Sequence, residues 1–242
     1  MFYRFLSKLA TQERLEVFPV PLKGSSWEKP AAWIPYMRDY EEKFNPIQLS
    51  KDTSGVNLFQ APYYTESGSR GLRLRYHVEK AIEKVPDIWG IEGRLIVSEK
   101  FKRVLESVDD MHHEYISIEI IDWNETTITT DQPYYWFNQR RFLTIDPFDR
   151  VVNHMEVGFC PIPGEEDFMA RVLETQCLRE LLEQFPIWQH IGLKGMEGRM
   201  SQVRCLLYMN QKLVDALEAV NVTGMDKYSQ KYGIGEESLC EI

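Results

Sequence analysis

Carboxylates and a pair of histidines dominate the middle of this chain. Residues 104–139 contain no Lys or Arg but eight acidic side chains: Glu106, Asp109, Asp110, Glu114, Glu119, Asp122, Glu125 and Asp131. Two kinds of chemistry are open to such a set. Asp109 and Asp110 could join His112-His113 in a metal site, or the carboxylates could form an acidic surface that attracts a basic partner.

The spacing of these residues argues against metal binding and catalysis. Adjacent histidines point to opposite faces of a strand and lie about 100° apart on a helix, so His112 and His113 are poorly placed to share one ion. The glycines of residues 192–198 are spaced G-x-x-G-x-x-G, which predicts a turn rather than a dinucleotide loop. We therefore predict no catalytic, cofactor-binding or metal-binding residue. A metal-dependent hydrolase that uses the acidic residues is the alternative, and a structural adaptor is another.

Charge is distributed unevenly along the 242 residues, whose formal net charge is −9. Residues 1–92 hold 13 basic and 12 acidic side chains, whereas residues 93–242 hold 15 and 25. An acidic field repels nucleic acid and attracts basic proteins such as nuclease domains. We expect neither nucleic acid nor a membrane as a direct partner. The acidic stretch is either a docking face for a basic protein or simply a solvated surface.

A docking face would draw on a defined set of residues. The carboxylates that we expect at or beside it are Asp109, Asp110, Glu114, Asp122 and Glu125. Three aromatic residues follow in the chain: Tyr134, Tyr135 and Trp136. They would either supply a binding hot spot or form the core side of the next strand.

A repeated segment indicates how the chain is built. Residues 97–108 read V-S-E-K-F-K-R-V-L-E-S-V, and residues 209–220 read M-N-Q-K-L-V-D-A-L-E-A-V. In each copy the second residue, Ser98 or Asn210, follows a short apolar run and favours the N-cap of a helix. Apolar residues then recur at helical spacing. The pattern predicts two strand–cap–helix units, at residues 93–108 and 205–220, with their apolar stripes buried.

The remaining pattern favours an α+β fold with a mostly antiparallel or mixed sheet. Residues 115–121 alternate as a strand does, and residues 134–143 predict another strand. Helices are predicted over residues 76–85 and 165–185. We divide the chain into an irregular lobe rich in aromatic residues and proline (residues 1–90) and an α+β domain (residues 91–242), packed together as one globule.

Three segments in a fixed order carry a family resemblance. They are L-I-V-S-E-K-F-K-R-V-L-E at residues 95–106, Y-Y-W-F-N at residues 134–138 with Asp146 after it, and L-V-D-A-L-E-A-V-N-V-T-G at residues 213–224. The series resembles immunity family eleven, a bacterial family that protects against polymorphic toxins, over about residues 91–225. After Thr223-Gly224 the chain turns polar, where the family pattern has a hydrophobic strand.

The resemblance implies a function and a cell compartment. Such a protein binds and blocks a cognate toxin without catalysis, and the toxin is expected to be a nuclease delivered by contact-dependent or type VI secretion. The N-terminus does not have the pattern of a signal peptide, and we expect a cytoplasmic protein. Its four cysteines should be free thiols in that compartment. The sequence does not indicate an oligomeric state.

Overall fold

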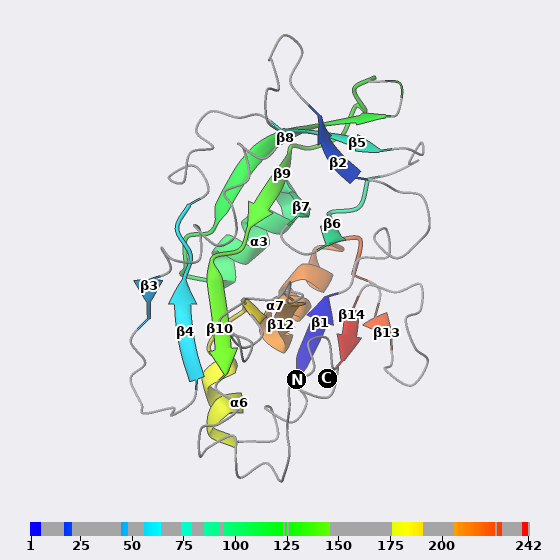
Figure 1. Ribbon diagram of the computed structural model, residues 1–242. Helices are drawn as coiled ribbons and strands as arrows, with labels where there is room; N and C mark the ends of the chain where they lie inside the picture. The colour runs from blue at the N-terminus through cyan, green and yellow to red at the C-terminus, as the bar shows by residue number, and fades with distance from the viewer. Residues whose placement is uncertain are drawn as a thin grey trace.

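The computed structural model describes residues 1–5, 17–20, 45–47, 56–63, 74–78, 85–91, 94–122, 124, 126–145, 176–190, 206–225, 227–228 and 239–241. These residues form two β-sheets and three α-helices (Figure 1). Most neighbouring strands run antiparallel, and three pairs run parallel. The predicted α+β class with mostly antiparallel sheets is confirmed.

The larger sheet has eight strands in the order β13-β14-β1-β12-β11-β10-β4-β3. Their bounds are β1 Phe2–Phe5, β3 Asn45–Pro46, β4 Val56–Gln60, β10 Arg141–Ile145, β11 Ile187–His190, β12 Leu206–Asn210, β13 Lys227–Tyr228 and β14 Leu239–Glu241. The smaller sheet has six strands in the order β2-β5-β8-β9-β7-β6. Their bounds are β2 Val17–Val20, β5 Leu74–Val78, β6 Ile88–Ile91, β7 Arg94–Ser98, β8 Glu114–Asp122 and β9 Tyr134–Asn138. Both sheets combine strands from before and after residue 90.

The two repeated segments form helices α3 (Glu99–Val108) and α7 (Gln211–Ala219), each directly after a strand. The side chain of Ser98 accepts a hydrogen bond from the amide of Phe101, and that of Asn210 accepts one from the amide of Leu213. These bonds satisfy an amide that the first turn of a helix leaves free. Both predicted strand–cap–helix units are confirmed. The third helix, α6, spans Gln176–Leu182.

The duplication extends beyond the segments that the sequence reveals. In the first unit, residues 88–89 of β6 pair with residues 97–96 of β7. In the second unit, residues 187–188 of β11 pair with residues 209–208 of β12. The first strand of each pair, β6 or β11, carries the dipeptide Ile-Trp at this register. Each unit is therefore an antiparallel hairpin followed by a capped helix.

Equivalent strands flank the other side of each hairpin. In the first unit Tyr135 of β9 lies opposite Val97, and in the second Tyr3 of β1 lies opposite Met209. The next strand, β8 or β14, is antiparallel to β9 or β1, and the strand after it, β5 or β13, is parallel. The hydroxyl of each tyrosine even donates to the first residue of its helix, Glu99 or Gln211. Five neighbouring strands of one sheet thus correspond to five of the other.

The chain order shows that the two units exchange a strand. β1 precedes the first unit in sequence but pairs with β12 of the second, whereas β9 precedes the second unit but pairs with β7 of the first. If the chain is divided between β8 and β9, each half contributes one of the five corresponding strands to the sheet of the other half. Neither half therefore contains its own complete set of five.

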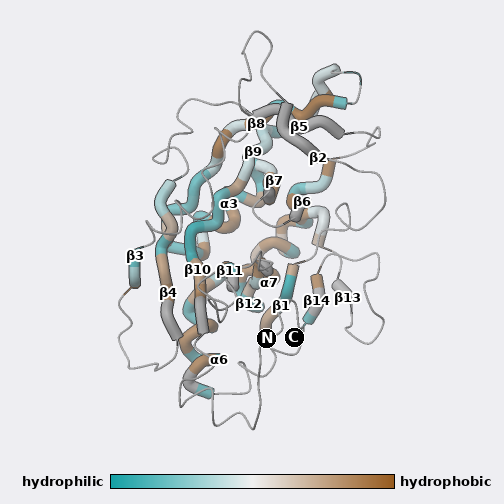
Figure 2. Tube along the Cα trace, in the orientation of Figure 1, coloured by the Kyte–Doolittle hydropathy of each residue, from teal (hydrophilic) through white to brown (hydrophobic). Residues whose placement is uncertain are grey.

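The main core lies where the two units meet. Figure 2 shows hydrophilic and hydrophobic residues alternating along α3, and its apolar side packs with α7 between strands of both sheets. Four side chains of the predicted stripes, Phe101, Leu105, Leu213 and Leu217, are 0% exposed. Their predicted burial is confirmed. At the C-terminal end of the second stripe, Val220 is 44% exposed.

Some local predictions differ from the structure. Residues 76–78, which we expected in a helix, belong to strand β5, where they pair with β2 and β8. The single strand expected over residues 134–143 is two strands, β9 and β10, that belong to different sheets. Within residues 165–185 the structure describes only α6 and the turn after it, and the Gly192–Gly198 loop lies outside the described residues. A two-residue strand, β13, forms in the polar segment after Gly224.

Candidate partner-binding site

Two polar clusters stand at equivalent places in the duplicated fold. In each, the loop after one repeated helix is linked to the first strand of the hairpin in the opposite unit, β6 or β11. The loop after α7 bonds to β6, since the amide of Ile88 donates to the carbonyl of Thr223. The loop after α3 is joined to β11 through Arg141, whose Nη1 donates to the carbonyl of Ile187. These clusters therefore fasten the two units to each other.

The first group, here named the Asp87 cluster, consists of Asp87, Ser98, Lys100, Gln132 and Thr223. The Asp87 carboxylate accepts from Ser98 Oγ at 2.7 Å, Gln132 Nε2 at 2.8 Å and Lys100 Nζ at 2.9 Å. It also accepts from the backbone amide and the hydroxyl of Thr223, at 2.8 and 3.0 Å. Although burial opposes ionisation of Asp87, these donors hold its pKa below the usual range.

The Asp87 cluster gives a structural role to the motifs that carry the family resemblance. Ser98 both caps α3 and donates to Asp87. Gln132 stands two residues before the tyrosine-rich strand, and Thr223 begins the Thr-Gly pair. Gly224 has φ +92°, and a Cβ there would overlap the carbonyl oxygen of Ile88. Lys100, in the first turn of α3, contributes its ammonium group to the same carboxylate.

The second group, here named the Asp109 cluster, consists of Asp109, His113 and Arg141. Arg141 forms a bidentate ion pair with Asp109, with both nitrogen–oxygen distances at 2.7 Å, and the side chain of Asp109 is 0% exposed. Asp109 also accepts from the amide of Met111 at 3.0 Å and lies 3.3 Å from His113 Nε2. The donors lower the pKa of Asp109 despite the opposing effect of burial, so the carboxylate is ionised.

His113 has a structural role in the Asp109 cluster. Its Nδ1 accepts from the amide of Arg140 at 3.1 Å, which assigns the proton to Nε2, next to Asp109. Burial lowers its pKa, so the ring is neutral at pH 7. Because both ring nitrogens are engaged, His113 has no free lone pair for a metal ion. His112 is exposed beside it, and among the described residues no group of three metal-ligating side chains occurs.

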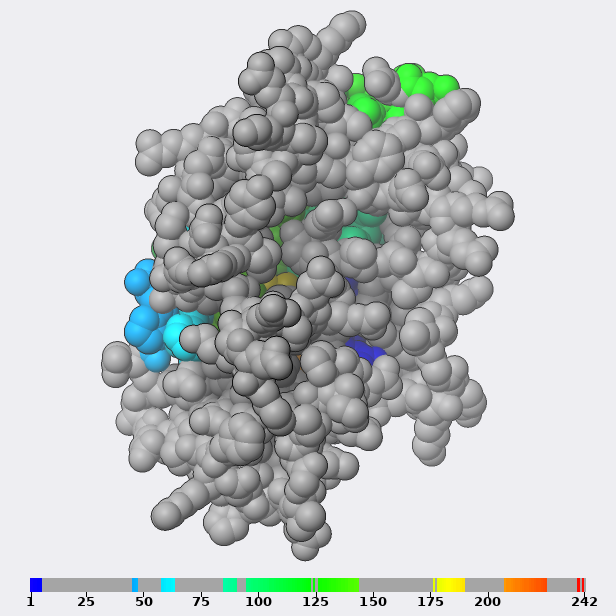
Figure 3. Space-filling view, viewed as in Figure 1, coloured from blue at the N-terminus to red at the C-terminus, as the bar shows by residue number. Residues whose placement is uncertain are grey.

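A surface pocket of about 560 Å³ opens next to the Asp109 cluster. We name it the Arg140 pocket. Its lining comes from β3, β4, the loop after α3, the junction of β9 and β10, and the turn after α6: Ile47, Leu58, Gln60, Tyr63, Asp110, Met111, His112, Arg140, Arg141 and Phe185. In Figure 3, residues 45–47 and 58–63 reach the surface together at the left edge. The pocket thus lies where the chain passes from the smaller sheet to the larger one.

The structure places four of the eight candidate interface residues inside the protein. Asp109 belongs to the buried cluster described above, and Glu114 is buried with Asn138 Nδ2 at 2.8 Å from its carboxylate. Tyr134 is 4% exposed and Trp136 is 1% exposed. For these two aromatic residues the alternative of a core role is the correct one. None of the four presents its side chain to a partner in this structure.

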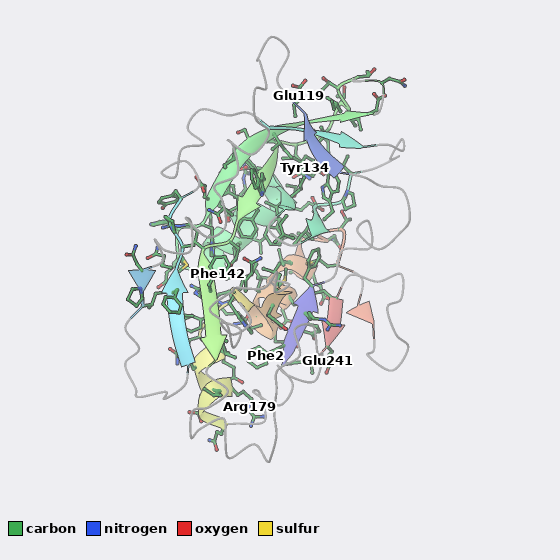
Figure 4. All side chains as sticks on the ribbon, in the orientation of Figure 1. Phe2, Glu119, Tyr134, Phe142, Arg179 and Glu241 are labelled. Carbon is green, nitrogen blue, oxygen red and sulfur yellow. The ribbon has the colours of Figure 1, made fainter. Side chains whose placement is uncertain are left out.

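The other candidates do not form one continuous patch. Asp110 is exposed at the Arg140 pocket, whereas Asp122 is at the far end of β8, where its Oδ1 accepts from two amides of the following turn. A nine-residue strand such as β8 spans about 27 Å at ~3.4 Å per residue. Tyr135 is half-buried on β9, and Glu125 lies outside the described residues. Figure 4 shows Glu119 near the upper end of β8, well away from Phe142 in β10.

The sequence analysis did not identify the basic residues of this site, or Asp87. Asp87, Arg140 and Arg141 were not among the candidates. A signal was present, because Arg140-Arg141 directly ends the stretch without basic residues. Two adjacent arginines after eight carboxylates suggest ion pairs with some of them. Only the fold shows that Arg141 pairs with Asp109, whereas Arg140 pairs with none of the described carboxylates.

Comparison with known proteins identifies the family. A model of the Imm11 immunity protein family matches residues 37–157, half of the 242-residue chain. The match includes the Ser98 and tyrosine-rich motifs and starts well before residue 91, where the resemblance seen in the sequence begins. The Thr-Gly motif lies beyond its end. No curated protein matches the chain. No helix in the described part of the chain is long and apolar enough to cross a membrane. This chain belongs to the Imm11 immunity protein family.

Proposed function

We propose that this protein binds a cognate toxin made by the same bacterium and neutralises it by stoichiometric inhibition. The family match carries this proposal, because members of an immunity protein family are expected to protect against a toxin. The fold is consistent with a binding role. Its exchanged strands and buried polar clusters make a rigid support, and a preorganised surface loses less conformational entropy when it binds.

A basic nuclease domain is the partner that we propose. Three carboxylates of the acidic stretch are exposed on separate elements: Glu106 on α3, Asp110 after it and Asp131 before β9. Residues 93–242 hold ten more acidic than basic side chains, and an acidic field accelerates the approach of a positively charged protein. Nucleases are commonly basic where they bind phosphate groups. Delivery of the toxin by a type VI or contact-dependent system is part of the same proposal.

Inhibition without catalysis fits the polar residues that the structure brings together. The buried carboxylates of Asp87 and Asp109 are each held by several donors, and those donors stabilise the ionised form. A general acid or base needs a pKa nearer the working pH and access to a substrate. A hydrolase function would have to use other carboxylates. We further propose that the protein works in the cytoplasm.

Co-expression with the toxin tests this function. The toxin domain encoded beside this gene should arrest growth when it is produced alone, and this protein should restore growth. The purified pair should form a one-to-one complex by size-exclusion chromatography with light scattering. Restored growth with substoichiometric protein and no complex would instead indicate catalytic removal of the toxin.

A further inference from the structure

Arg140 is a buried cation without an acidic partner among the described residues. The residue is 6% exposed, yet the described groups to which its side chain bonds are all neutral. Nε donates to the carbonyl of Ala61 and Nη1 to the carbonyl of His112, each at 2.7 Å. The guanidinium carbon lies 3.5 Å from the centre of the Tyr63 ring. Nη2 makes no hydrogen bond to any described residue, and Arg140 lines the pocket.

Among the described residues, the buried carboxylates near the pocket bond to other groups than Arg140: Asp109 pairs with Arg141, and Glu114 accepts from Asn138. Arg140 and Arg141 bring two positive charges, and the buried carboxylate of Asp109 compensates one of them through its bidentate pair with Arg141. His113 is neutral because burial lowers its pKa. Among the described pocket residues Asp110 is the one carboxylate, and it is exposed. A buried charge without a counterion is unfavourable, so an anion that enters here gains a strong interaction.

The pocket walls determine which anion fits best. Ile47, Leu58, Met111 and Phe185 supply apolar surface, and the ring of Tyr63 fixes the plane of the guanidinium. A planar guanidinium with an open donor suits a carboxylate, and the apolar walls suit a hydrocarbon stem that carries it. Volumes of roughly 300–1,000 Å³ are typical of sites that enclose such groups, and this pocket falls in that range.

We propose that the Arg140 pocket binds a carboxylate on an apolar stem that belongs to the partner protein, a glutamate side chain or the C-terminal residue. This inference rests on the proposed function and names how the toxin would dock. The surrounding acidic surface attracts basic proteins in general. A single positive pocket within it selects the one partner that places a carboxylate at that point, because a mismatched partner leaves Arg140 without its counterion.

A small-molecule titration tests the chemistry of the pocket directly. The probe is 3-phenylpropionate, the control compound is 3-phenylpropionamide, and the readout is the NMR signal of the Arg140 side chain. The carboxylate should shift this signal saturably, and the amide should not. Gln60→Glu adds a negative charge to the pocket without changing side-chain volume and should weaken binding at least about tenfold. Asp110→Asn should strengthen it. Equal responses to the two compounds, or none to either, would overturn the proposal.

Binding to the toxin tests whether the partner supplies the carboxylate. Gln60→Glu should weaken the complex at least about tenfold through faster dissociation, whereas Gln184→Glu, the same change at an exposed position outside the pocket, should not. Arg140→Gln should also weaken it, with Arg179→Gln on α6 as its matched control (Figure 4). Since Arg140 is buried, its variant is interpreted only if its thermal unfolding resembles that of wild type.

The outcomes separate this inference from the proposed function. If wild type and Gln60→Glu bind the toxin equally, the pocket is not the docking point, while the immunity function stands. If wild type does not bind the toxin at all, the proposed function fails. The phenylpropionate titration then decides the chemistry of the pocket independently.

Discussion

Replacing Asp87 with asparagine removes the negative charge at the centre of the Asp87 cluster. The substitution keeps the size and shape of the side chain but turns one acceptor oxygen into a donor. The Asp87 carboxylate receives hydrogen bonds from four residues that belong to β7, α3, the segment before β9 and the loop after α7. We therefore expect the substitution to lower the stability of the fold.

The size of the loss follows from the donors. If the amide nitrogen replaces Oδ2, the Thr223 hydroxyl can turn to accept, but Lys100 Nζ and the Thr223 amide lose their acceptor. If it replaces Oδ1, the Ser98 hydroxyl can turn to accept, but Gln132 Nε2 loses its acceptor. One buried donor therefore loses its partner in either orientation, which costs about 1–3 kcal/mol. Lys100 is 36% exposed, so its lost ion pair adds no more than ~1 kcal/mol. The total is therefore about 1–4 kcal/mol.

Urea denaturation at pH 7, followed by tryptophan fluorescence, measures this difference. Asp131→Asn is the matched control, since Asp131 is exposed and the same substitution there should change stability by about 0.5 kcal/mol or less. The pKa of Asp87 is lowered in the folded state. Its contribution is therefore present above the reference value of 3.8 and is lost as the pH falls through the folded-state pKa. The gap between wild type and Asp87→Asn should accordingly narrow below about pH 4. An Asp87→Asn variant as stable as Asp131→Asn at pH 7 would refute this account of the cluster.

Four further predictions concern the core, pH, charge and thiols. Leu105→Ala and Leu217→Ala should each lower the free energy of unfolding by about 2–5 kcal/mol in the same assay, because both side chains are fully buried; losses under ~1 kcal/mol would contradict the shared core. The folded-state pKa of His113 is lowered, so stability should fall as the pH drops below the reference value of 6.5, and His113→Gln should flatten this part of the profile; an unchanged slope would count against the neutral ring. Reversing Asp110 and Asp122 to Lys together should slow association with the toxin and weaken its salt dependence in stopped-flow measurements; unchanged rates would exclude electrostatic steering by these residues. Mass spectrometry after alkylation without reduction should find all four cysteines labelled, and a disulfide in freshly prepared protein would oppose the cytoplasmic assignment.

Much of the architecture could be predicted because it depends on local patterns. A cap residue followed by apolar residues at helical spacing determines a helix and its buried face from a dozen positions. Both repeated units are therefore correct, including the capping bonds of Ser98 and Asn210. The order of three short motifs likewise pointed to the family that the comparison shows.

The full extent of the duplication could not be seen in the sequence. The exchanged strands β1 and β9 share only Tyr and Phe at equivalent positions, and insertions of different lengths separate the equivalent elements. Residues 76–78, which we predicted as the start of a helix, pair with β2 and β8 in a sheet. Their sequence, Tyr-His-Val, itself suits a strand, because Tyr and Val are enriched in strands.

The burial of several candidate interface residues could not be predicted for a related reason. Sequence shows that Asp109 and Asp110 are adjacent but not that the chain turns between them, which buries one against Arg141 and exposes the other at the pocket. Charge counts treat the two residues alike. Only tertiary structure separates a carboxylate that stabilises the fold from one that a partner can reach.

The central claim is that this member of the Imm11 family neutralises a toxin by binding it. Isothermal titration calorimetry of the purified protein with the toxin domain encoded beside its gene tests that claim most directly. We expect a stoichiometry of one to one, tight binding, and loss of toxin activity in proportion to the amount of complex. Absence of binding by a folded protein to an active toxin domain would contradict the claim.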